Sequence, residues 1–331
     1  MCTGQQHEVE AQPGTYEMRV IGSPPKKKPR KSTFVIRKEE KASLLAELQM
    51  LEKHASYLLT VASTQSIVSG LLNTDQMNPL STFIHLGTDW DERRKVLIEL
   101  KEQNLRNATS YIATRSQFLN PLKLHCSDER FETERGDYCC VRFHVRQFES
   151  VSSVKQVYDA FMQFLMNVEI TISEQLGHIT VRDDCDHVDN KSMFNVRFLS
   201  SVSDMLVESN LVVFAKYSEG GDDDLVGDGG PYGMIAIDTV DQDDLFPYSP
   251  HECVRKDFVT AMVLTPHTRK RRDSKEGEEE LVVVLTQGKF IKLHRPEFEI
   301  SSSTMHDLRE GVTCWEKVMV KSVNEILEQA R

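Results

Sequence analysis

The stretch SSSTMHDLREGVTCWEKVMVKSVNEILEQAR, Ser301–Arg331, contains the pattern that decides the fold. The hydroxyl side chains at its start can cap a helix, and Thr304 with Asp307 matches a capping box. Apolar residues then recur every three or four positions, which predicts one amphipathic helix to the end of the sequence, roughly 40 Å long at about 1.5 Å per residue. The stripe consists of Met305, Leu308, Val312, Trp315, Met319, Val323 and Ile326.

The region before this helix has the period of strands. In YCCVRFHVRQF (residues 138–148), apolar side chains alternate with Arg142, His144 and Arg146, so the two sets occupy opposite faces. One internal helix is expected at Ser153–Val168 and another at residues 89–120, ending at Asn120-Pro121. Further strands are expected around residues 170–172, 179–181, 193–199, 211–217, 234–239, 258–265 and 281–286.

Many consecutive strands with few intervening helices indicate an antiparallel sheet instead of β-α-β crossovers. The fold class predicted is therefore α+β, with a helix-grip arrangement in which the long C-terminal helix lies on a curved antiparallel sheet.

Three segments are expected along the chain. Residues 1–31 form a basic tail that has little apolar surface to bury and is expected to be disordered. Residues 32–72 form an amphipathic helix or short coiled coil, and residues 80–331 form the globular domain.

The tail ends in a compact basic cluster, PKKKPRK, which is typical of a nuclear-import signal; the alternative is a solvated basic tail. The same arm does not favour sequence-specific DNA binding. A basic zipper reads DNA through a continuous helix in its basic arm, and Pro29 would interrupt that helix. Basic zippers also use an Asn in this arm to read base edges, and no Asn precedes Asn73. Contacts with phosphate groups would be independent of base sequence. The cluster consists of Lys26, Lys27, Lys28, Arg30 and Lys31.

The following helix carries a short leucine stripe. Leu44, Leu48, Leu51 and Leu58 lie on one face, as in a coiled coil of about three heptads. The stripe is compatible with a homodimer and equally with docking of the helix on its own globular domain.

Composition excludes some locations. The 331-residue chain has a net charge of −11 and seven cysteines without a CxxC pair, which suits a reducing compartment. Neither an apolar signal core nor a transmembrane segment is visible in the sequence. We therefore expect a nuclear or cytoplasmic protein.

The motifs of common enzymes and metal sites are not found. GxSxG, GxxxxGK and HExxH do not occur, so no catalytic residue and no cofactor are predicted and the chain is expected not to be an enzyme. The segment DDCDH, Asp183–His187, offers one Cys and one His without a second pair, so we expect a polar turn instead of a metal site.

Several segments resemble a known family. RKSTFVIRKEEKASLLAELQMLE (residues 30–52), RGDYCCVRFHVRQFESVSSVKQVYDA (135–160) and RKDFVTAMVLTPHTRKRR (255–272) look like oomycete StAR-related lipid-transfer-like (START-like) proteins often labelled mating-specific. ITISEQLGHITVRDD (170–184) and LTQGKFIKLHRPEF (285–298) carry the same likeness. The resemblance implies a fold that encloses a lipid, a sterol or another apolar molecule between sheet and terminal helix, and it supplies no catalytic residues.

A cavity of this kind would be lined by large apolar side chains that face the terminal helix, although the same side chains could fill the space completely. Arg142 and Arg197 are expected to face solvent. Gly311 could allow the helix to bend or could allow close packing. The candidate ligand-binding residues are Phe143, Phe198, Phe214, Met262, Trp315 and Met319.

The sequence thus predicts a non-enzymatic protein that binds a lipid or sterol-like ligand, with a zipper-type transcriptional regulator or a ligand-free interaction scaffold as alternatives.

Overall fold

The computed structural model describes residues 41, 44, 78, 80–189, 192–221, 226, 229–270, 279–312 and 314–330, with the backbone alone for 184–189. The chain divides into two units, Met1–Ser56 and Tyr57–Arg331, and all the elements named below belong to the second.

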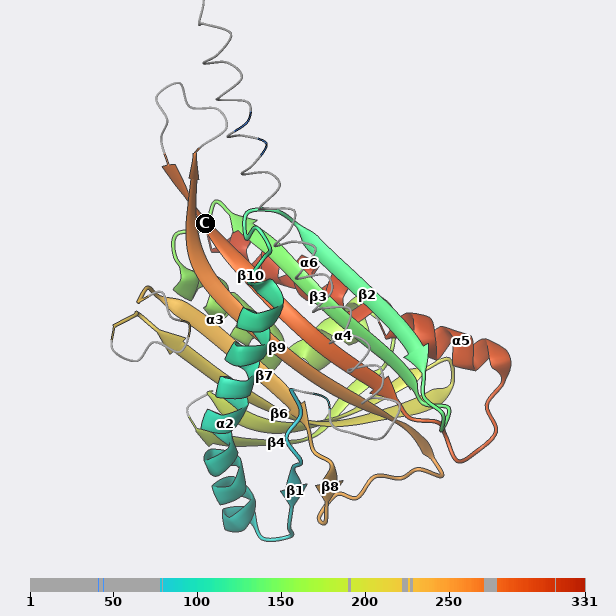
Figure 1. Cartoon of the computed structure of the whole chain (residues 1–331). Helices are drawn as coiled ribbons and strands as arrows, with labels where there is room; N and C mark the ends of the chain where they lie inside the picture. The colour runs from blue at the N-terminus through green and yellow to red at the C-terminus, as the bar shows by residue number, and fades with distance from the viewer. Residues whose placement is uncertain are drawn as a thin grey trace, which may run out of the picture. The chain divides into compact units, whose positions relative to one another are not determined.

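A large antiparallel sheet is the centre of the second unit (Figure 1). Its strand order is β2-β3-β10-β9-β7-β6-β5-β4, and a short parallel pairing also joins Leu206–Glu208 of β6 to Cys253–Arg255 of β9. The strands are β2 (His125–Glu132), β3 (Tyr138–Glu149), β4 (Thr180–Asp189), β5 (Met193–Val202), β6 (Met205–Ser218), β7 (Tyr232–Thr239), β9 (Cys253–Lys270) and β10 (Glu279–Leu293).

Helices cover both faces of this sheet. In Figure 1, α2 (Trp90–Ser116) lies in front of the strands, and α3 (Val154–Met166), α4 (Val168–Leu176) and α6 (Cys314–Gln329) lie behind them. The short strands β1 (His85–Leu86) and β8 (Gln242–Asp243) pair in parallel beside the start of α2. Because both faces are covered, central strands such as β7 are buried along their whole length.

Two contacts hold α2 against the strands, one a buried ion pair and the other a close contact between a ring and a glycine. Arg93 donates to both carboxylate oxygens of Asp243 at 2.6 and 2.9 Å, and both side chains are buried. Farther along α2, the ring of Tyr111 lies against Gly288 of β10, where a Cβ atom would be 2.3 Å from Tyr111 Cε1. Only glycine leaves room for this contact.

The C-terminal helical segment is broken, which corrects the prediction of one continuous helix. α5 (Ser302–Gly311) ends at Gly311, and α6 begins at Cys314. Glycine is about 1 kcal/mol less favourable than alanine inside a helix, which explains an end at this position. No atom lies within 4 Å of a Cβ built on Gly311, so close packing is not its role. The N-cap of α5 is Ser301, whose Oγ accepts from Thr304 N at 3.1 Å.

Two other local predictions were wrong. Residues 170–172, predicted as a strand, lie in α4, which packs against α6 and ends at Gly177 in the left-handed conformation. The segment 183–187, predicted as a polar turn, continues strand β4. The helices predicted over 89–120 and 153–168 are confirmed by α2 and α3, with Asp89 and Ser153 as N-caps.

Candidate functional site

A small apolar cavity of about 60 Å³ lies between the sheet and α6. Its walls come from α3, α4 and α6 on one side and from β5, β6, β7, β9 and β10 on the other. Most of the lining is aliphatic or aromatic, and the polar side chains Gln287, Lys289 and Glu316 are the exceptions. The arrangement is suited to an apolar molecule with a polar end.

Four of the six predicted ligand-binding residues meet at this cavity. Phe198 (β5) and Met262 (β9) contribute from the sheet, and Trp315 and Met319 contribute from α6. The rings of Phe198 and Trp315 have centroids 6.3 Å apart in an edge-on arrangement. The placement of these four residues agrees with the prediction, and ligand binding by them stays a prediction.

Phe143 and Phe214 lie on the opposite face of the sheet, which corrects their assignment to the cavity. Both are buried in the cluster beneath α2, and Tyr111 contacts Phe143 edge-on with ring centroids 6.3 Å apart. On β6 both faces are apolar, so alternation could not decide whether Phe214 or its neighbour Val213 faces α6.

The polar face of β3 points towards α6, contrary to the expectation that Arg142 faces solvent. Arg142 Nη1 lies 2.7 Å from Glu316 Oε2, and His144 Nε2 lies 3.2 Å from the same oxygen. Lys289 of β10 also forms an ion pair with Glu316. Three basic side chains therefore converge on one carboxylate in the first turn of α6.

This ion cluster is nearly enclosed, because the side chains of Lys289 and Glu316 are 4% and 9% exposed. Burial acts to raise the pKa of Glu316, but His144 and Lys289 outweigh burial and lower that pKa to about 2. Burial lowers the pKa of Lys289, because the opposing effect of Glu316 is smaller than the cost of desolvating the ammonium. The cluster binds the start of α6 to β3 and β10.

Arg197, also expected to face solvent, is mostly buried and paired. Its Nε lies 2.8 Å from Glu208 Oε1, and a second ion pair joins it to Asp183. Arg197 does not line the cavity.

Lys256 of β9 lies beside the cavity. Every second residue of a strand points to the same face of the sheet. Lys256 therefore shares the face of Phe258 and Met262, which line the cavity. Its ammonium lies 3.7 Å from the centre of the Trp315 ring. Burial lowers the pKa of Lys256 to about 8.

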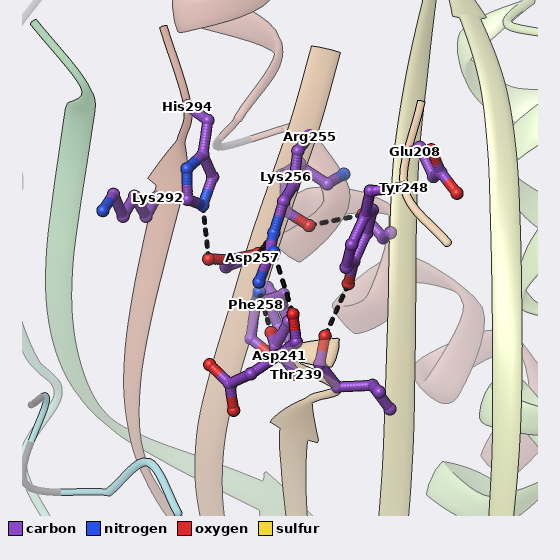
Figure 2. Close-up of polar contacts among 12 residues, drawn as sticks. Glu208, Thr239, Asp241, Tyr248, Arg255, Lys256, Asp257, Phe258, Lys292 and His294 are labelled. Carbon is purple, nitrogen blue, oxygen red and sulfur yellow. Dashed lines mark hydrogen bonds and ion pairs between the residues drawn. The ribbon is translucent and has the colours of Figure 1, made fainter. Parts of the chain in front are cut away.

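A second polar cluster lies on the opposite face of β9 (Figure 2). His294 Nε2 lies 2.5 Å from one oxygen of Asp257, and Arg255 donates to the other oxygen at 2.6 Å. Arg255 also stacks on the ring of Tyr248 at 4.0 Å, and Tyr248 donates to the carbonyl oxygen of Val240 at 2.7 Å. These contacts satisfy both oxygens of Asp257, so the cluster connects strands and presents no free carboxylate.

Within the part of the chain that the structure describes, no three His, Cys, Asp or Glu side chains are grouped so that they could hold a metal ion. In the same residues, none of the helices is both long enough and apolar enough to cross a membrane.

The N-terminal predictions fall almost entirely outside the described residues. The import cluster at residues 26–31 lies outside them, as do Leu48, Leu51 and Leu58 of the leucine stripe. Leu44 is described as helical with 59% of its surface exposed. Nuclear import and dimerisation stay predictions from the sequence, as does the expectation that the basic arm does not bind DNA sequence-specifically.

Fold and site together define an α+β protein in which a large antiparallel sheet and a C-terminal helix enclose a small apolar cavity. No family model matches the chain, and no curated protein does.

Solved structures include two distant likenesses. The crystal structure of a conserved protein from Geobacillus kaustophilus matches at 8% identity over 57% of this chain and 95% of that chain, with a TM-score of 0.27. The crystal structure of Ara h 8.0201 matches at 11% identity over 55% of this chain and 99% of that chain, with a TM-score of 0.20. At these scores neither likeness supports an argument about function.

Proposed function

We propose that this chain is a non-enzymatic, START-like protein of helix-grip type that binds an apolar or amphipathic small molecule between its sheet and α6. The observation that carries the proposal is the cavity beneath α6, where Phe198, Met262, Trp315 and Met319 form apolar walls beside a charged cluster. Removal of apolar surface from water, at roughly 25 cal/mol per Å², would drive binding.

The size of the cavity implies that α6 moves. Its volume of about 60 Å³ is far below the roughly 300–1,000 Å³ of ordinary ligand pockets, so a guest larger than a few atoms must displace part of the wall. α6 is the wall suited to this movement, because it is separated from α5 by a break after Gly311.

The charged groups at the cavity suit positioning of α6 better than catalysis. Glu316 is paired with Arg142 and Lys289, and its pKa of about 2 leaves it without a proton to donate near neutral pH. A general base would need a pKa closer to the working pH. This supports a binding role instead of an enzymatic one.

The test is equilibrium binding of decanol, a neutral apolar probe, to the full chain. Val213→Phe should weaken binding at least tenfold, because Val213 lines the cavity and the larger ring occupies it. Val181→Phe, at an exposed position of β4 outside the cavity, should bind as the unmodified chain does. Thermal unfolding verifies that both variants are folded. Failure of the unmodified chain to bind decanol or other apolar probes would refute the function.

A further inference from the structure

Lys256 differs from the other basic side chains around the cavity in its partners. Arg142 and Lys289 are paired with Glu316, and Arg197 on β5 is paired with Glu208. For Lys256, none of the carboxylates in the described residues lies within ion-pair distance. Its ammonium instead contacts the face of Trp315 at 3.7 Å.

The surroundings of Lys256 offer little compensation for its charge. Glu316, the acidic side chain next to Trp315 in α6, is already bound by three basic groups. On β6, Ser209 Oγ donates to the backbone carbonyl of Lys256 and does not engage its ammonium. A contact with an aromatic face stabilises a cation by less than a buried carboxylate does.

The position of Lys256 links it to the proposed ligand. Trp315 contacts the ammonium and also lines the cavity with Phe198. Phe258, Thr260 and Met262 follow Lys256 on the same face of β9. Of these three, Phe258 and Met262 line the cavity. A molecule that lies along Phe258 and Met262 therefore has its end near the ammonium of Lys256.

We propose that the ligand of this cavity is an amphiphile with a single carboxylate head, and that Lys256 binds the head while the apolar tail lies beneath α6. This inference rests on the proposed function and specifies the class of its ligand. An incoming carboxylate would supply the negative partner that Lys256 lacks among the described residues, and a charge-assisted hydrogen bond would hold it. With a pKa of about 8, the ammonium is mostly protonated at pH 7 and available to the head.

The experiment compares dissociation constants of decanoate and decanol for the full chain at pH 7, because the two probes share a tail and differ in the charge of the head. The unmodified chain should bind decanoate at least tenfold more tightly than decanol. Lys256→Met keeps most of the aliphatic stem and should bring the two affinities within about twofold. Lys256→Arg should restore the preference for decanoate.

Lys321→Met is the matched control, since Lys321 is an exposed lysine of α6 that pairs with Glu325. This variant should keep the full preference for decanoate.

The outcomes separate this inference from the proposed function. If decanol binds but decanoate has no advantage, or if Lys256→Met keeps the advantage, the assignment of Lys256 is overturned and the apolar site stands. If neither probe binds, both proposals are overturned. Retained binding of decanol by Lys256→Met shows that the cavity of the variant is intact.

Discussion

Glu316 Oε2 lies 2.7 Å from Arg142 Nη1, although the two residues are 174 positions apart in the chain. Their ion pair connects the first turn of α6 to β3. With His144 and Lys289 on the same carboxylate, it determines where the C-terminal helix meets the sheet.

Glu316→Gln should lower the free energy of unfolding at pH 7 by about 2–4 kcal/mol, because it removes the carboxylate that pairs with the buried ammonium of Lys289. The folded-state pKa of Glu316, about 2, lies below its ordinary value of 4.5. Its stabilisation is therefore fully present above pH 4.5 and is lost as pH falls towards 2.

Urea unfolding of both proteins between pH 2 and pH 7 measures this difference. The exposed pair of Lys321 and Glu325 provides a control, since Glu325→Gln should change stability by less than about 0.5 kcal/mol. An equal loss for Glu316→Gln at every pH would contradict the assignment.

The same substitution should speed ligand uptake if α6 moves to admit the guest. Loss of the carboxylate weakens the attachment of the helix to β3 and β10. We expect stopped-flow association of decanol with Glu316→Gln to be several-fold faster than with the unmodified chain. An unchanged association rate would indicate that the guest enters by another route.

Asp243→Ala should cost about 3–5 kcal/mol, because it leaves the buried guanidinium of Arg93 unpaired. Thermal or urea unfolding measures the loss. Glu102→Gln removes an exposed α2 pair with Arg106 at 4.0 Å and should be nearly neutral. Equal stability of the two variants would contradict the role of the Arg93–Asp243 pair in holding α2.

Gly288→Ala should destabilise the protein by about 1–3 kcal/mol, since the added methyl group meets the ring of Tyr111. Gly311→Ala adds the same group where no atom lies within 4 Å, so it should be neutral or slightly stabilising. Adding Tyr111→Ala to Gly288→Ala should recover part of the penalty for the alanine at 288, as measured in a double-mutant cycle. If the stability effects of Gly288→Ala and Tyr111→Ala simply add, contact between the new methyl group and the Tyr111 ring is not the cause of the destabilisation.

The general architecture was predictable because the spacing of apolar residues matches the helix or strand that each of these segments forms. The three-to-four-residue spacing of Val312, Trp315 and Met319 predicted helix, and the alternation in β3 predicted strand. Edge strand β2 was missed because its sequence, HCSDERFE, has only one large apolar residue, Phe131. A single apolar residue shows no alternation. Residues 170–172 were misassigned because their β-branched side chains favour strands, whereas packing against α6 favours the helix.

The candidate site was predictable only in part. Alternation identified Arg142 and His144 as one polar face, but solvent is the usual neighbour of such a face, and their partner Glu316 is far away in sequence. Lys256 gave no signal, because its single charge lies in the charged run Arg255-Lys256-Asp257. Only the register of β9 separates Lys256 from Asp257 and places them on opposite faces.

Fluorescence of Trp315 tests the central claim most directly. The chain has two tryptophans, and Trp90 lies at the start of α2 on the other face of the sheet, so Trp90→Phe leaves Trp315 as the reporter. A bromine-substituted decanol quenches tryptophan on contact. If the guest lies beneath α6, quenching saturates and excess decanol reverses it. Quenching that rises linearly without saturation, or that decanol does not reverse, would contradict binding in this cavity.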